Sequence, residues 1–160
     1  METLTELATA LGVWPGAQWL RASWVAYLVV NAVHIIGIAL LVGPIVILDL
    51  RLMGAWRHLP LSALAPLLSH VAAFGLGLAV LAGAWLFTVR PAEYLANPAF
   101  GWKLALIALA LANIAVQHAN PAYRRALATD LASAGVKLSA AASALLWVGV
   151  VIAGRWIGFA

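Results

Sequence analysis

Four long runs of apolar residues, separated by short polar stretches, dominate this chain. A helix needs about 20 apolar residues to cross the hydrocarbon core of a bilayer, and each run has about that length. The runs are rich in leucine and alanine and lack the in–out alternation of membrane barrel strands. The pattern therefore predicts an all-α fold with four transmembrane helices, over residues 24–48, 61–89, 100–118 and 136–159.

Most charged residues lie in the connections between these runs. The connections carry Asp49, Arg51, Arg57, His58, Arg90, Glu93, Arg124, Arg125 and Asp130. No other segment is long enough to form a second core. We therefore expect residues 1–160 to form a single transmembrane domain, an integral membrane four-helix bundle.

Residues 1–20 predict a short helix lying on the membrane surface rather than a signal peptide. Glu2 and Glu6 stand where a signal peptide would carry basic residues. Gly12 and Pro15 then interrupt the helical pattern. Four apolar residues share one helical face before that point: Leu4, Leu7, Ala8 and Leu11.

Composition supports the membrane class, because 66% of the residues are hydrophobic and 9% are charged. The chain has no cysteine, which excludes disulfides, thiolate metal sites and iron–sulfur clusters. The net charge is +4, but the basic residues are scattered over membrane connections, so we expect no nucleic-acid partner. The sequence also contains no phosphate loop and no recognisable nucleophile–base pair.

Three histidines lie inside the apolar runs: His34, His70 and His118. An imidazole at membrane depth is costly and marks a candidate functional site, and imidazoles ligate haem iron and copper. With about 1.5 Å of rise per residue, His70 and His118 lie roughly 22 Å below the N-terminal aromatic belt, and His34 roughly 15 Å. Two axial haem ligands are only about 4 Å apart. Depth therefore favours His70 with His118, while helix tilt leaves His34 with His118 open.

Each histidine also has a structural interpretation, as a helix cap or as a hydrogen-bonding contact between helices. Asn31 lies one turn before His34, where its side chain can orient that ring. Arg155 near the end of the last run can donate to a haem propionate or extend to the lipid headgroups.

Two further patterns accompany the histidines. Small residues at four-residue spacing form one smooth face of the second run, which suits either a flat cofactor or close helix packing. Asn113 and Gln117 share a face of the third run. The small residues are Gly75, Ala79 and Gly83.

Several short motifs together resemble an uncharacterised bacterial family of four-helix membrane proteins. That family is distantly similar to the membrane domain of copper-resistance D proteins and, in architecture, to small b-type cytochromes. The resemblance implies that His34 and His118 are the recurring histidines and that His70 is not one of them. The motifs are Val33–Gly37, Leu48–Gly54, Asn97–Lys103, Asn113–His118, Leu146–Trp147 and Gly154–Trp156.

These observations predict a b-type cytochrome-like protein that binds haem b between transmembrane helices and takes part in electron transfer, rather than a stand-alone enzyme. The candidate ligands are His34, His118 and His70, with Asn31 and Arg155 as further cofactor contacts. One alternative is a copper-handling membrane protein or permease, which the lack of Cys and of a thioether pair makes weaker. The other alternative is a cofactor-free structural subunit of a larger complex.

The expected partners are the lipid bilayer, a quinone or redox partner protein, and further copies of the chain or other subunits of a membrane complex. We expect the protein in a bacterial inner membrane. The first and third connections, with their flanks, carry five basic residues against four on the opposite side. The positive-inside rule therefore predicts that both termini are periplasmic.

Overall fold

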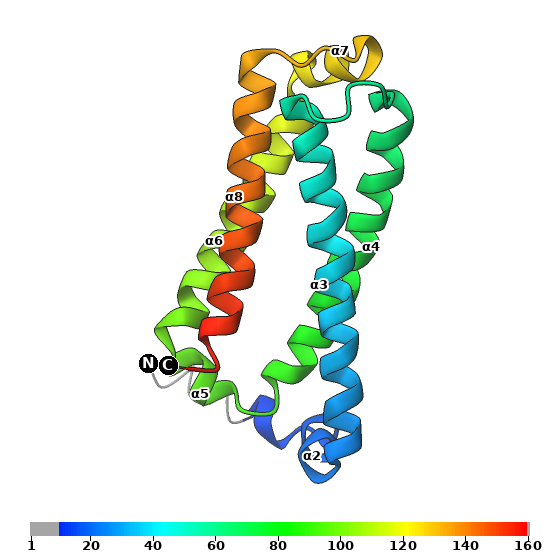
Figure 1. Cartoon of the computed structure of the whole chain (residues 1–160). Helices are drawn as coiled ribbons and strands as arrows, with labels where there is room; N and C mark the ends of the chain where they lie inside the picture. Colours follow the sequence, from blue (N-terminus) through cyan, green and yellow to red (C-terminus); the bar gives the residue numbers. More distant parts are fainter. Residues whose placement is uncertain (1–9, 160) are drawn as a thin grey trace.

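The protein is a bundle of four long helices with shorter helices at its ends (Figure 1). The computed structural model describes residues 10–159, and every regular element in that range is a helix. Four helices, α3, α4, α6 and α8, are long and apolar enough to cross a membrane, which confirms the predicted all-α membrane bundle. The helices are α2 (Pro15–Ala22), α3 (Trp24–Met53), α4 (Leu61–Phe87), α5 (Pro91–Ala96), α6 (Pro98–Ala119), α7 (Pro121–Thr129) and α8 (Ala134–Trp156).

Helix α3 is longer than the sequence predicted, and this changes where its charged residues lie. It ends at Met53, where Gly54 adopts a left-handed conformation (φ 118°) that closes the helix C-terminus. Asp49 and Arg51, which we expected in a connection, are therefore part of α3 and are buried. The prediction was wrong because the charged residues were taken as the end of the apolar run.

The short helices α5 and α7 were not predicted. Both begin with proline in the first turn, where the missing N–H is not needed and the fixed φ favours a helix. Asn97 and Asn120 each accept a hydrogen bond from the backbone two residues later, at the starts of α6 and α7.

Most of the predicted surface helix, including Leu4, Leu7 and Ala8, lies outside the described residues. Within them, α2 packs against the end of α4 next to the membrane-spanning bundle. The Trp85 indole donates to the Gly16 carbonyl at 3.1 Å, and the ring of Trp19 stacks on it at 5.9 Å. This contact holds α2 across the end of the bundle.

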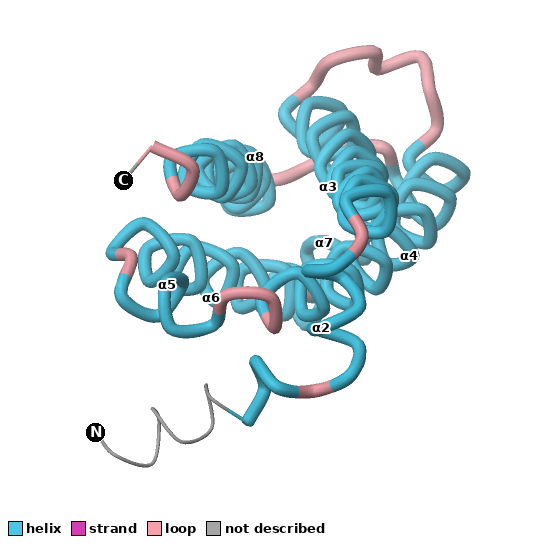
Figure 2. Tube along the Cα trace, turned by 90° about the horizontal axis from the view of Figure 1, so that it is seen from below, coloured by secondary structure: helices cyan, strands magenta, loops and turns pink. Residues whose placement is uncertain are grey.

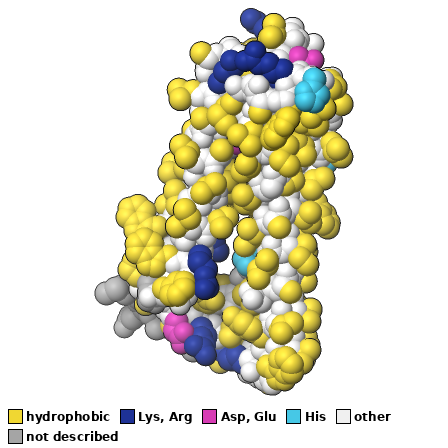
Figure 3. Space-filling model, viewed as in Figure 1, with side chains coloured by type: hydrophobic (Ala, Val, Ile, Leu, Met, Phe, Trp, Pro, Cys, Tyr) yellow, Lys and Arg dark blue, Asp and Glu magenta, His cyan; other side chains and the backbone are white. Residues whose placement is uncertain are grey.

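The four long helices form two hairpins that join along one edge. Helix α3 packs along α4, α6 packs along α8, and α3 also packs against α8. Helices α4 and α6 are much less closely packed than these three pairs, and α7 contacts both of them across one end of the bundle (Figure 2). Hydrophobic side chains cover the visible long faces, while Lys and Arg gather towards the two ends, as a membrane-spanning bundle requires (Figure 3).

The small-residue face of α4 packs directly on the backbone of α3. A Cβ atom at Gly75 would lie 2.5 Å from the Leu41 nitrogen and 2.8 Å from the Gly37 carbonyl oxygen. A Cβ atom at Gly37 would in turn lie 2.6 Å from the Ala79 nitrogen. Of the two interpretations of this face, close helix packing is therefore the one the structure supports.

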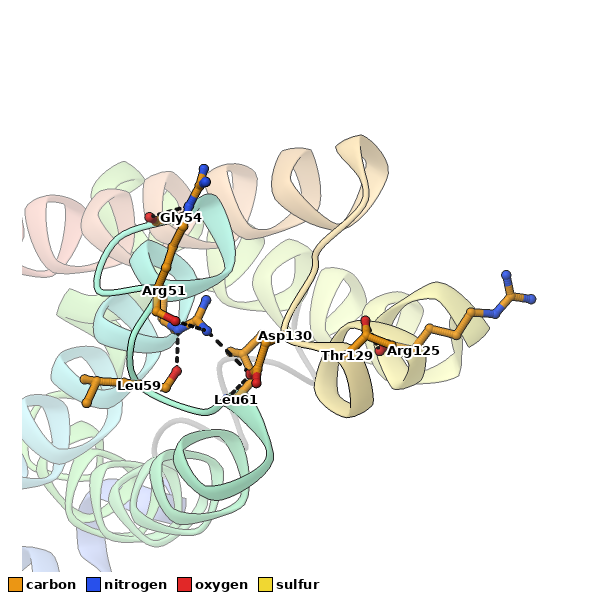
Figure 4. Close-up of polar contacts among 8 residues, drawn as sticks. Arg51, Gly54, Leu59, Leu61, Arg125, Thr129 and Asp130 are labelled. Atoms are coloured by element: carbon orange, nitrogen blue, oxygen red, sulfur yellow. Dashed lines mark hydrogen bonds and ion pairs between the residues drawn. The ribbon is translucent and has the colours of Figure 1, made fainter.

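Arg51 ties together the two connections at the α7 end of the bundle (Figure 4). Its guanidinium donates to the Leu59 carbonyl at 2.8 Å and lies 3.5 Å from the Asp130 carboxylate. The same carboxylate accepts the backbone N–H of Leu61 at 2.6 Å, which caps the start of α4. Asp130 itself has a left-handed backbone (φ 59°), a conformation that aspartate tolerates well.

We predict that Gly75→Ala destabilises the protein by about 1–3 kcal/mol, because the added methyl group meets the α3 backbone. The matched control is Gly77→Ala on the same helix, where a Cβ would meet nothing within 4 Å. The control should leave stability unchanged or raise it by up to about 1 kcal/mol. Unfolding midpoints of the two purified variants in detergent check this, and equal midpoints would contradict it.

Asp130→Ala should also destabilise the protein, by about 1–2 kcal/mol, because the Leu61 N–H loses its cap and Arg51 loses its carboxylate. Arg125→Ala is the control. Its exposed side chain points away from the cluster in Figure 4, so we expect a change within about 0.5 kcal/mol. Unfolding midpoints in detergent measure both variants. A loss of stability in Arg125→Ala alone would refute the stabilising role of the Asp130 contacts.

Candidate functional site

A cavity of about 320 Å³ lies between the two hairpins, near the α7 end of the bundle. Helices α3, α4, α6 and α8 form its walls, and Tyr123 of α7 contributes to one end. We call this space the Asp49 cavity. Most of its lining is apolar, and its polar or partly polar lining side chains are Asp49, Ser69, Asn113, Gln117, His118, Tyr123, Ser143 and Trp147.

Three side chains that line this cavity each carry a buried polar atom without a hydrogen-bonding partner. The atoms are Oδ2 of Asp49, Oε1 of Gln117 and the indole Nε1 of Trp147, on side chains 3%, 8% and 1% exposed. Within residues 10–159, no other buried side-chain nitrogen or oxygen lacks a partner. A polar group left unpaired in this way costs about 1–3 kcal/mol, and the hydrocarbon of a bilayer offers it no alternative partner. The position of these three side chains, from three helices, around one cavity marks it as a candidate binding site.

Neighbouring polar groups in the same region are paired. The Asn113 amide donates to the Ser139 carbonyl oxygen at 3.0 Å, and the Ser139 hydroxyl donates back to Asn113 Oδ1 at 3.0 Å. This reciprocal pair joins α6 to α8. Asn113 therefore has a structural partner, whereas Gln117, one turn further along the same helix, has an amide oxygen without one.

The acidic centre of the cavity is Asp49, with Ser143 of α8 and Tyr123 of α7 beside it. Tyr123 is 3% exposed. Burial raises the pKa of its phenol, and the neighbouring Asp49 carboxyl raises this pKa further. A neutral tyrosine hydroxyl therefore lies at the end of the cavity that α7 covers.

His118 lies at the edge of the cavity and is exposed. Its Nδ1 is 2.9 Å from the Ile114 carbonyl oxygen, and its ring lies 5.1 Å from that of Tyr123, centre to centre. A carbonyl oxygen can only accept, so Nδ1 carries a proton and is the donor of this hydrogen bond. Within residues 10–159, Nε2 has no hydrogen-bonding partner. Nε2 is thus the ring nitrogen of His118 that remains for a further partner.

The structure does not bring His34 and His118 together. His34 is half-buried, donates from Nδ1 to the Ala79 carbonyl at 2.8 Å, and its ring packs on Gly83. It lies fifteen residues before Asp49 on α3, which places it about 22 Å along the bundle from the level of Asp49. Lys103, which lies near His34, precedes His118 on α6 by the same number of residues. One iron cannot be bound by both histidines, since axial ligands are about 4 Å apart.

His70 is at the expected depth but does not line the cavity. Its neighbour Ser69 is a lining residue, so His70 lies at about the level of His118. The His70 side chain is exposed, with Nδ1 2.6 Å from the Pro66 carbonyl of its own helix. Depth therefore matched His70 to His118 correctly, but the direction of the side chain around the helix separates them.

The two further cofactor contacts we expected lie away from the cavity. The first of these contacts is Asn31, which we expected to orient the His34 ring. The Ala79 carbonyl orients that ring instead, and the described residues show no hydrogen bond from Asn31 to it. Arg155 is exposed, with its guanidinium 4.5 Å from the centre of the Phe159 ring. In the described part of the chain, no three His, Cys, Asp or Glu side chains are close enough to hold a metal ion.

Sequence reasoning missed the central residue, Asp49, although a signal was present. Leu41, Ile45 and Asp49 follow one another at four-residue spacing and therefore share the face of α3 that lines the cavity. Ser143 and Trp147 have the same spacing on α8. Continuing the helical period past Leu48 would have placed the carboxylate inside the bundle.

Residues 22–160 match a family described as a family of unknown function (DUF6644). The match covers most of the chain, so the chain belongs to that family. No curated protein and no solved structure matches it. Because the family description states no activity, the Asp49 cavity is the feature on which a function can be based.

Proposed function

We propose that this member of the DUF6644 family binds a small amphipathic molecule inside the membrane, in the Asp49 cavity. The observation that carries the proposal is that the three side chains with unpaired buried polar atoms, from three different helices, all line one cavity. A ligand that pairs them removes a cost that the empty protein bears. The volume of about 320 Å³ is at the lower end of the range for small-molecule sites, so the ligand is small.

The unpaired atoms define what the ligand must offer. Asp49 and Gln117 present acceptors, while the Trp147 indole presents a donor. The remaining lining is mainly apolar. The ligand therefore combines an apolar body with a polar end that both donates and accepts hydrogen bonds. Ordered water is the alternative occupant, because the volume equals that of about ten water molecules.

Haem b bound through His118 is the second candidate. It is supported by the position of His118 among the lining residues, by its Nδ1 hydrogen bond to the Ile114 carbonyl, which leaves Nε2 for a ligand bond, and by the resemblance to small b-type cytochromes. When bound, the haem would supply one-electron redox chemistry, with a quinone or a redox protein as partner. His118 would be its only histidine ligand from this chain, since His34 lies about 22 Å away. Copper is a weaker candidate than haem, because a copper ion needs several ligands and His118 is the one histidine among the lining residues.

We propose that the protein resides in a bacterial inner membrane with both termini periplasmic. Helix α2 and the end of α8 lie at one end of the bundle, and α7 lies at the other (Figure 1). The α7 end carries the slight excess of basic residues, which favours the cytoplasmic side. Membership of a larger complex, or assembly of several copies, remains compatible with the exposed apolar helix faces.

A pair of substitutions on α6 tests the binding site. Gln117→Leu removes an unpaired buried acceptor, so we expect it to stabilise the ligand-free protein by about 1 kcal/mol. Asn113→Leu is the matched control, and it should destabilise by about 1–3 kcal/mol because it leaves Ser139 without its partner. Unfolding midpoints in delipidating detergent measure both. Equal destabilisation by the two variants would show that Gln117 belongs to a structural water network and would refute the binding site.

For the haem candidate, the expected result is a Soret band in the visible spectrum of protein reconstituted with haem. His118→Ala should lose this band, while His34→Ala should keep it, because His34 lies far from the cavity. His70→Ala should also keep the band, since that side chain does not line the cavity. No Soret band in the wild-type protein, or its loss only in His34→Ala, would exclude ligation by His118.

A further inference from the structure

The Asp49 cavity has buried walls on one side and an exposed edge on the other. Its lining residues from α3 and α8 include the most deeply buried ones, such as Asp49, Ser143 and Trp147. On α4 and α6 the lining includes the exposed residues Ala73 and Leu111. These two helices are much less closely packed than the pairs α3–α4, α6–α8 and α3–α8. The mouth of the cavity is therefore the space between α4 and α6.

This mouth faces lipid rather than water. Ala73 lies twelve residues, or about 18 Å, after the start of α4 and is more than 20 Å from its end. Leu111 is likewise in the interior of α6, about 12 Å from the nearer end. Both positions fall at the level of the bilayer hydrocarbon, which is about 30 Å thick. An exposed residue at that depth contacts acyl chains.

The end of the cavity nearest the aqueous phase is covered. Helix α7 crosses from α4 to α6 at that end, and its residue Tyr123 lines the cavity while being only 3% exposed. The opposite end is filled by apolar side chains from all four long helices, with Leu41, Ala110 and Val150 at its centre. A molecule that reaches Asp49 without unfolding α7 therefore arrives sideways, from the bilayer.

The shape and chemistry of the interior narrow the class of molecule further. Three aromatic rings line the cavity, those of His118, Tyr123 and Trp147, and aromatic rings pack favourably on one another. The unpaired atoms require a group that both donates and accepts. A phenolic hydroxyl does both, and a ring bearing it remains soluble in the hydrocarbon. Charged or strongly polar molecules do not enter through lipid.

We infer that the Asp49 cavity takes a lipid-soluble phenol or hydroquinone, which enters from the bilayer between α4 and α6, donates its hydroxyl hydrogen to Gln117 or Asp49, and accepts a hydrogen bond from the Trp147 indole. This inference rests on the proposed binding function and adds the class of ligand and its route. A fully oxidised quinone has acceptors only, so it pairs Trp147 but not the two acceptors. The site therefore favours the hydroxylated form over the oxidised form of the same ring.

The test uses the full chain in phosphatidylcholine nanodiscs and a phenol that carries a photoreactive diazirine on an alkyl tail. We expect labelling of cavity residues, reduced at least tenfold by excess 4-hexylphenol. The methyl ether 4-hexylanisole has the same shape but no donor, so it should compete at least tenfold less well. Gln117→Leu should weaken this competition as well. Equal competition by the ether would overturn the proposed ligand class and indicate a cavity that holds any apolar chain.

The route is tested by two identical substitutions on α4. Ala73→Trp fills the mouth, and we expect it to slow labelling at least tenfold. Ala84→Trp places the same side chain at an exposed position outside the cavity and should not change the rate. Equal rates for the two variants would overturn entry between α4 and α6. The competition experiment and the comparison of the two Trp variants could both fail while Gln117→Leu still stabilises the ligand-free protein. That result would reject this class of ligand and this route, but not the proposed binding site.

Discussion

The backbone contact between α3 and α4 is the constraint on which the rest of the bundle depends. Gly37 and Gly75 bring the two helices so close that a single methyl group at either position meets backbone atoms of the other helix. With α4 held on α3, helix α8 packs on both α6 and α3, and the space between α4 and α6 is the less closely packed side of the bundle. The cavity therefore results from tight packing between α3 and α4 combined with loose packing between α4 and α6. His34 belongs to the same interface, since its ring occupies the space that the missing side chain of Gly83 leaves.

Inside a bilayer, polar groups must find partners within the protein. The chain meets this demand where polar groups hold helices together: Asn113 and Ser139 satisfy each other, and Arg51 is paired with the Asp130 carboxylate and backbone carbonyls. Only at the Asp49 cavity do buried polar atoms of the described residues remain without partners. This exception is informative because the polar groups that hold the helices together are paired. Asn113 has its partner on α8, whereas the amide oxygen of Gln117, one turn away on the same helix, has none.

Much of the fold could be predicted from the sequence, because apolar length alone identifies a membrane-spanning helix. The four spans were placed within a few residues, apart from the end of α3, where Asp49 was taken as the first residue of a connection. The short helices α5 and α7 escaped because their prolines were not recognised as helix starts. The small-residue face of α4 was identified, but the sequence did not reveal whether it contacts a cofactor or another helix. Whether this face contacts a cofactor or a helix depends on which helix packs against α4, and the sequence of α4 does not specify that.

For the candidate site, the sequence could predict how deep each histidine lies along the bundle, but not which way its side chain points around the helix axis. Counting residues at about 1.5 Å each placed His70 and His118 correctly at one level, yet each residue also turns the helix by about 100°, and that rotation leaves His70 outside the cavity. A histidine within a membrane span is costly wherever it lies, but a backbone carbonyl can pair its Nδ1, as it does for His34, His70 and His118. An intramembrane histidine is therefore weaker evidence for a site than an unpaired carboxylate. Ser143 lies beside the Asp49 carboxyl, yet Oδ2 of that group keeps no partner among the described residues, so a molecule in the cavity has a polar atom left to pair.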